Sequence, residues 1–134
     1  MMDFRDNGMC FACGEKNPRG LKLRFRLNEA AGEAEEEIVF PDDLQGWDGV
    51  VHGGLLATVL DEAMIYAAGA KHIKSITGEI TVRYLEPART SVGYKVIGRV
   101  VEDKGRIILA ESELVGPDGR PVARARGKLF KIKA

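Results

Sequence analysis

Residues whose side chains could take part in chemistry gather in one short stretch, GVVHGGLLATVLDEAMIYAAG, which spans residues 49–69. Its apolar pattern predicts a helix over residues 54–68, with His52 just before the start. Two carboxylates, Asp61 and Glu62, interrupt the middle of this helix. A buried carboxylate costs free energy unless it is paired, hydrogen-bonded or used in chemistry. Because neighbouring helix positions lie about 100° apart, we expect one carboxylate, with Asp61 the stronger candidate, to be functional. The other is then structural or lies at an edge.

The two glycines at the helix start predict a place where negative charge can develop. The first N–H groups of a helix have no partner within it and lie at the positive end of its dipole. Glycine at positions 53 and 54 lets a ligand approach these N–H groups closely. A carbonyl oxygen that gains charge would be stabilised there, as in an oxyanion hole. The alternative is that Gly53 and Gly54 only allow a tight turn against a neighbouring strand.

The distance between Gly53 and Asp61 along the helix limits how the two residues can act together. Gly53 and Asp61 are eight residues apart, which is about 12 Å along a helix axis. Reacting groups must come within about 3 Å, so Asp61 cannot act on a carbonyl held at the start of its own helix. A helix that is apolar nearly all round also needs more cover than one sheet supplies, either from another chain or from a bound apolar ligand. Burial thus favours a dimer, and if Gly53 and Asp61 act together they must come from different subunits with antiparallel helices. The alternative for Asp61 is a polar contact across the dimer.

The remaining sequence predicts an α+β domain, with one long helix and a mostly antiparallel sheet of about six strands. Residues 1–20 are rich in turn formers and predict an irregular lead-in, followed by a single domain over residues 21–134. Alternation predicts a half-buried strand over LKLRFRL at 21–27, and a second strand covers EAEEEIVF at 33–40. Further strands are expected in SITGEITVRYLEP, SVGYKVIGRVVED, GRIILAESELVG and RPVARARGKLFKIKA.

Composition excludes several classes of function. The chain has 20 basic and 20 acidic residues, which argues against a dedicated nucleic-acid binder. Without a signal peptide or a run of about 18 apolar residues, we expect a cytoplasmic protein that does not enter membranes. Cys10 and Cys13 would then stay reduced. A zinc site in CFAC would need further ligands, of which His52 and His72 are the strongest candidates. We favour an ordinary thiol-bearing loop, with no metal and no cofactor.

Several motifs resemble those of the hotdog-fold acyl-CoA thioesterases, in particular the PaaI-like branch and related mammalian thioesterase-superfamily proteins. The motifs are LQG at 44–46, HGGLLATVLDEA at 52–63, TGEITVRYLEPA at 77–88, the closing PDGRPVARARGKLF and the N-terminal CFACGEKNPRGLKLRF. Together they cover most of the chain. The resemblance implies a hotdog fold, in which the sheet wraps a long central helix. It also implies hydrolysis of an acyl-CoA thioester by a homodimer or a dimer of dimers.

The resemblance also implies catalytic roles for five residues. Asp61 would be the general base or nucleophile that delivers water, and the N–H of Gly53 from the partner would polarise the thioester carbonyl. His52 would orient that loop, Gln45 would lie near the thioester, and Thr77 would help to position water beside Asp61. Alternatives for these last three are a packing histidine, a surface-loop amide and an ordinary strand threonine.

Substrate contacts are expected from Gly54, Leu55 and Arg83. Leu55 would line the acyl pocket, and Arg83 is among the basic residues available to the CoA phosphates. The alternative function is a non-catalytic acyl-CoA sensor, but residues 1–20 are too short for the DNA-binding segment of such a regulator. A dehydratase on the same fold is a third alternative, and its usual histidine and acid spacing fits this sequence less well.

Overall fold

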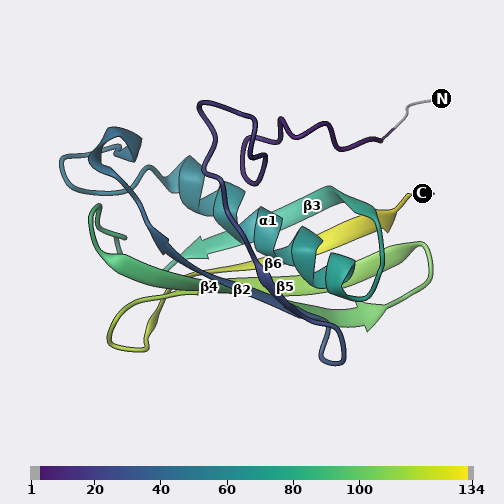
Figure 1. Cartoon of the computed structure of the whole chain (residues 1–134). Helices are drawn as coiled ribbons and strands as arrows, with labels where there is room; N and C mark the ends of the chain where they lie inside the picture. Colours follow the sequence, from purple (N-terminus) through teal and green to yellow (C-terminus); the bar gives the residue numbers. More distant parts are fainter. Residues whose placement is uncertain (1–3, 133–134) are drawn as a thin grey trace.

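The computed structural model describes residues 4–132, in which one helix lies across a six-stranded antiparallel sheet (Figure 1). The sheet order is β1-β2-β4-β5-β6-β3, so β1 and β3 form its two edges. The predicted α+β class with one central helix is therefore confirmed. The elements are β1 (Arg26–Asn28), β2 (Glu33–Val39), the 3-10 turn η1 (Asp42–Leu44), α1 (Gly53–Ala70), β3 (Ser75–Tyr84), β4 (Gly93–Asp103), β5 (Ile107–Val115) and β6 (Pro121–Lys131).

The first strand is shorter than the sequence predicts. Residues 21–25 are not part of the sheet, and β1 contributes only three residues. Lys22 has a φ of 55°, which interrupts the extended run. The N–H groups of Leu21 and Leu23 donate to carbonyls of the lead-in instead of to a neighbouring strand. Leu27, predicted to be buried, is consequently 52% exposed, so alternation alone misplaced this segment.

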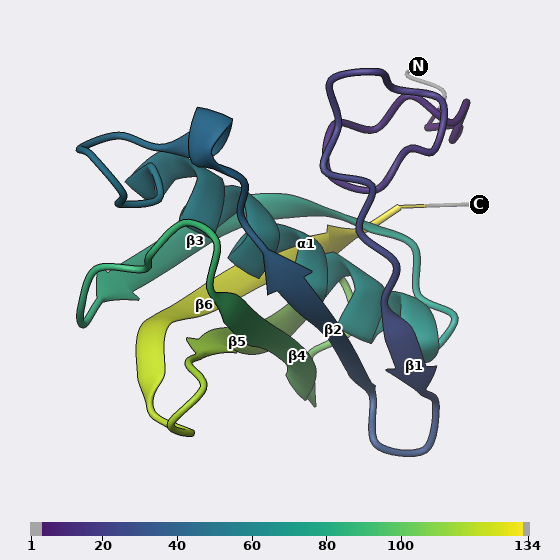
Figure 2. The same cartoon turned by 60° about the vertical axis from the view of Figure 1, so that its left-hand side comes forward.

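The chain itself covers part of the helix face that the sheet leaves open. Figures 1 and 2 both show the lead-in on the side of α1 away from the sheet. Ala12 of the lead-in belongs to the same buried core as the helix, and so does Leu23 of the segment that follows it. In the same segment, Phe25 stacks on Tyr66 with ring centroids 4.9 Å apart. Only Gly54 and Gly69 of α1 are exposed. The lead-in has no helix or strand among its described residues, yet it supplies cover that the sequence assigned to a partner chain or ligand.

Close contact between α1 and the sheet depends on glycine in β4. Val59, Leu60, Ala63 and Met64 of the helix are completely buried against the strands. A Cβ added at Gly98 would lie 2.2 Å from the carbonyl oxygen of Ala63, so the helix backbone occupies the place of a side chain. In the described part of the chain, no helix has the length and hydropathy that crossing a membrane requires.

Replacing Gly98 by alanine should destabilise the protein because the added methyl group forces α1 away from the sheet. We expect Gly98→Ala to lower the free energy of unfolding by about 2 kcal/mol. Gly93→Ala in the same strand is the matched control, because a Cβ at Gly93 meets no atom within 4 Å. Urea unfolding of both variants provides the measurement. Equal stabilities would contradict a close contact at Gly98.

Candidate functional site

Asp61 is held in place by a threonine on the neighbouring edge strand. The hydroxyl of Thr77 in β3 donates to Asp61 Oδ1 over 2.5 Å, and both residues are partly buried. A bulge between Thr77 and Glu79 interrupts the pairing of β3 with β6 at this point, and bulges redirect neighbouring side chains. None of the hydrogen bonds among residues 4–132 engages Asp61 Oδ2. One carboxylate oxygen is therefore fixed, while the other can accept a proton.

Glu62 faces a different part of the molecule. Its carboxylate accepts a hydrogen bond from Cys10 Sγ of the lead-in at 3.2 Å. Burial raises the pKa of Glu62 above its usual value, and hydrogen bonds from the thiols of Cys10 and Cys13 offset this only in part. Burial also raises the pKa of Cys13 to about 12. The two adjacent carboxylates thus have separate surroundings, as their positions around the helix predicted.

At the start of α1, one backbone N–H has no partner among residues 4–132. His52 is the N-cap, and its Nδ1 accepts the N–H of Gly54 at 3.0 Å. The carbonyl of Gly53 accepts the hydroxyl of Tyr84 at 2.8 Å. The N–H of Gly53 makes no hydrogen bond to any described residue. The atoms nearest to a Cβ at Gly53 would belong to the Tyr84 side chain, at an ordinary 3.6 Å, so packing within the chain does not require glycine here.

An open cavity of about 770 Å³ lies beside the helix start. Gln45 shapes the adjoining loop, since its Oε1 accepts the N–H of Gly49 at 2.9 Å. Trp47 is 86% exposed, which is unusual for so large an apolar side chain. The lining comes from Gly46, Trp47, Val50, Val51, His52, Gly53, Leu56 and residues 84–88. The structure therefore brings the Gln45 loop, His52 and Gly53 together at one apolar cavity.

Other predicted site residues lie apart from this cavity. Arg83 is exposed and pairs across the sheet with Arg124, where both line a second cavity together with Arg126 and Glu111. Leu55 is half-buried beside the core, while Gly54 uses its N–H for the His52 cap. In one chain, the structure thus forms two separate groups, the helix start and the Asp61–Thr77 pair.

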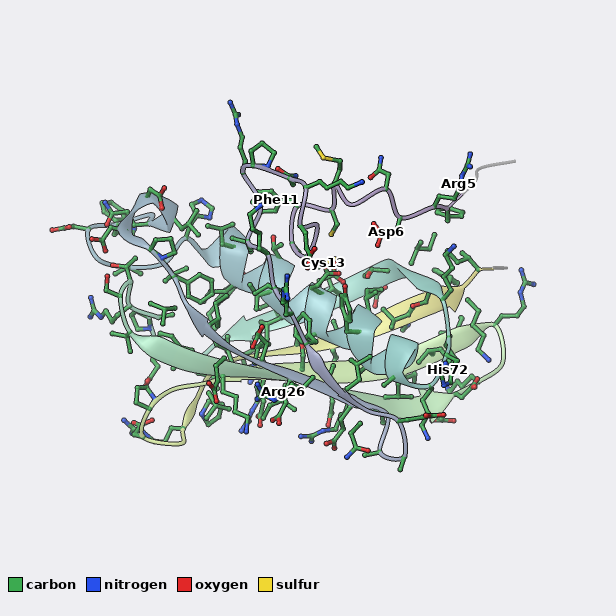
Figure 3. All side chains as sticks on the ribbon, viewed as in Figure 1. Arg5, Asp6, Phe11, Cys13, Arg26 and His72 are labelled. Atoms are coloured by element: carbon green, nitrogen blue, oxygen red, sulfur yellow. The ribbon has the colours of Figure 1, made fainter. Side chains whose placement is uncertain are left out.

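Neither histidine lies with the cysteines. His52 caps the helix, and Figure 3 shows His72 well away from Cys13, beyond the opposite end of α1. His72 Nε2 instead lies 2.9 Å from Glu29 Oε1. Sequence analysis also gave no site role to Tyr84. The available signal was its place in the predicted strand, where Tyr84 follows Ile80 and Val82 at alternate positions.

Comparison with known proteins identifies the class to which this fold and site belong. Residues 48–123 match the thioesterase superfamily, so the chain belongs to that family. An uncharacterized protein of Schizosaccharomyces pombe is 30% identical over 110 residues, covering 78% of this chain and 63% of that protein. A protein of Saccharolobus solfataricus named as a candidate esterase is 26% identical, covering 80% of this chain and 77% of its own length. The chain thus spans less than two thirds of the yeast relative.

Solved structures confirm the hotdog fold. A thioesterase superfamily protein superposes with a TM-score of 0.85 at 22% identity, covering 93% of this chain and 61% of that one. A hypothetical thioesterase of Streptococcus pneumoniae, solved with coenzyme A, gives 0.76 at 16% identity, covering 81% and 84%. PaaI of Escherichia coli gives 0.73 at 21%, covering 78% and 75%. Two further structures of the S. pneumoniae protein each carry one substitution by alanine. One replaces an aspartate, and the other replaces a threonine sixteen positions further along that chain.

The His52 cap should contribute measurably to stability. His52→Ala removes the acceptor for the Gly54 N–H and should lower the free energy of unfolding by about 1 kcal/mol. His52→Asn should restore most of this loss, because asparagine is a good N-cap residue. Chemical denaturation of both variants tests the assignment. A His52→Asn protein no more stable than His52→Ala would argue against the cap as the source of the effect.

Proposed function

We propose that this protein hydrolyses an acyl-CoA thioester to the free acid and CoA. The observation that carries the proposal is the hydrogen bond from Thr77 to Asp61 in the middle of a buried helix. A carboxylate in that environment needs a compensating role. Asp61 and Thr77 are sixteen positions apart, the same separation as the aspartate and threonine replaced in the S. pneumoniae protein.

In the proposed reaction, Asp61 acts as general base. Its Oδ2 takes a proton from water while the water oxygen bonds to the thioester carbon. The carbonyl oxygen becomes negatively charged and accepts the N–H of Gly53 at the positive end of α1. When the tetrahedral intermediate collapses, the carbon–sulfur bond breaks and the CoA thiolate takes the proton from Asp61. This leaves the free acid and CoA, and the carboxylate is restored.

Two chains would form each site, because the proposed base and the N–H of Gly53 lie more than two turns apart on one helix. The edge strand β3 offers a surface for a second copy. It spans ten residues, and within the described part of the chain it pairs on one side only, with β6. A long free edge is normally covered in native proteins. Two copies joined along β3 would have antiparallel helices, with Asp61 of one chain facing the helix start of the other.

The cavity at the helix start is the proposed place for the reacting part of the substrate. It is mainly apolar and adjoins the N–H of Gly53. The S. pneumoniae protein was solved with coenzyme A, and a structurally similar protein of Streptococcus mutans was solved bound to acetyl-CoA. These complexes support a CoA thioester as the substrate class. Gln45 and Leu55, at and near this end of α1, are proposed to contact the thioester and acyl group. Arg83 remains a candidate for the CoA phosphates.

Replacing Asp61 by asparagine should abolish most hydrolysis, because the amide cannot act as a base. The two side chains have nearly the same volume, so packing should be unchanged. We expect kcat for acyl-CoA hydrolysis to fall by about 100-fold or more. Thr77→Val, which keeps the shape but removes the hydroxyl, should cost about tenfold, whereas Thr77→Ser should retain most activity. Thiol release from short-alkyl, long-alkyl and aryl CoA thioesters provides the measurement.

Glu29→Gln is the matched control for Asp61→Asn, because the same chemical change occurs at an exposed residue near the far end of α1. It should retain wild-type activity. Undiminished thiol release by Asp61→Asn would refute the proposed base. Tight binding of all three CoA thioesters, with no release by the wild type, would instead support the acyl-CoA sensor.

Removing the N–H of Gly53 tests the other half of the site. Gly53 is the first helical residue, where proline is tolerated, and His52 has a ψ of 128°, which suits a following proline. Gly53→Pro should lower kcat by about 100-fold or more. Gly53→Ala retains the N–H and is the matched control.

Co-expression of Asp61→Asn with Gly53→Pro tests whether two chains share each site. In a mixed dimer, one site combines an intact Asp61 with an intact Gly53. We expect about a quarter of wild-type activity, because about half of randomly assembled dimers are mixed and have one working site of two. If both groups came from one chain, every site would carry a defect and no activity would return.

A further inference from the structure

The lead-in contains a closed loop that presents two cysteines to the helix. The N–H of Lys16 donates to the carbonyl of Gly8 at 2.9 Å, and the N–H of Gly14 donates to that of Cys10 at 2.8 Å. A Cβ at Gly14 would lie 2.4 Å from the Gly8 oxygen. The turn after Cys13 is therefore so tight that glycine is required, which indicates a built loop around the cysteine pair.

Three ligating atoms meet where this loop contacts α1. The sulfur atoms of Cys10 and Cys13 and a carboxylate oxygen of Glu62 all lie within 4.8 Å of one another. Within residues 4–132, this is the only such group of three or more His, Cys, Asp or Glu side chains. Figure 3 shows Cys13 directly above the helix ribbon. The spacing Cys-x-x-Cys is that of one half of many zinc sites, and Glu62 supplies a ligand from 49 positions further along the chain.

The surroundings of these atoms favour a cation. The N–H of Cys13 points at Cys10 Sγ from 3.4 Å, a contact that stabilises charge on the sulfur. Glu62 takes part in none of the ion pairs formed among the described residues, although it is partly buried. Asp61 and Asp6 add further negative charge nearby. A lysine or arginine would normally balance such a group, and a metal ion could supply the same positive charge.

We propose that Cys10, Cys13 and Glu62 bind one Zn²⁺ ion, with water as the fourth ligand. Two sulfur ligands favour zinc over Mg²⁺ and Ca²⁺, which prefer oxygen, and a carboxylate is an accepted third ligand. The ion would join the lead-in to the middle of α1 and so close a long loop of chain. Its role is structural, because Asp61 faces Thr77 on another side of the helix. The site is independent of the proposed thioesterase activity.

Cobalt provides a direct test in the full-length, reduced protein. Titration with Co²⁺ under anaerobic conditions should give one equivalent bound per chain, with thiolate-to-cobalt absorption and the strong visible bands of a tetrahedral ion. Added Zn²⁺ should displace the cobalt and raise the Tm of the protein. Glu62→Gln and Cys13→Ser should each weaken cobalt binding at least about 100-fold, more than loss of an outer-shell partner usually costs.

Asp61→Asn is the matched control for Glu62→Gln, since it makes the same change at the adjacent helix residue and should retain the cobalt spectrum. Circular dichroism and gel filtration establish that the variants are folded before metal is added. Cobalt spectra unchanged in folded Glu62→Gln and Cys13→Ser would overturn the proposal. The absence of thiolate-to-cobalt absorption in the reduced wild type, with both thiols titratable, would also overturn it.

Discussion

Burial of α1 is the constraint on which the rest of the structure depends. An almost wholly apolar helix requires cover on nearly every side, and this helix also has two carboxylates at its centre. The sheet approaches so closely that Gly98 leaves no space for a side chain against the Ala63 carbonyl. The lead-in covers a second side. The same neighbours must also supply hydrogen-bond partners for the carboxylates of Asp61 and Glu62 without exposing the apolar residues beside them.

The fold satisfies the two carboxylates in different ways because adjacent helix positions face different neighbours. Asp61 meets the edge strand, where Thr77, beside a bulge, donates its hydroxyl to one carboxylate oxygen. The other oxygen makes no hydrogen bond among residues 4–132. Glu62 meets the lead-in, where its hydrogen-bond partner is a thiol. A partly buried carboxylate, with one oxygen that makes no hydrogen bond among residues 4–132, suits proton transfer. A carboxylate beside two cysteines suits a structural contact that holds the lead-in against α1.

Much of this arrangement could be predicted from the sequence, because periodicity reports burial directly. The position of α1, the sheet of six strands and the separate surroundings of Asp61 and Glu62 all follow from apolar spacing and helix geometry. The strand predicted over residues 21–27 failed because a left-handed Lys22 and bonds to the lead-in are tertiary effects. Grouping Glu62 with Cys10 was also beyond the sequence, since the two are 52 positions apart.

The helix start shows how one side chain can prepare a backbone group for binding. His52 uses its ring nitrogen to satisfy the N–H of Gly54, and Tyr84 engages the carbonyl of Gly53. These two bonds hold the first turn in place from both sides, while the N–H of Gly53 stays open beside the cavity. A rigid helix then separates this N–H from Asp61 of the same chain by about 12 Å. In the proposed mechanism, the rigidity that positions the two groups would also prevent one chain from bringing them together, so hydrolysis would require self-association.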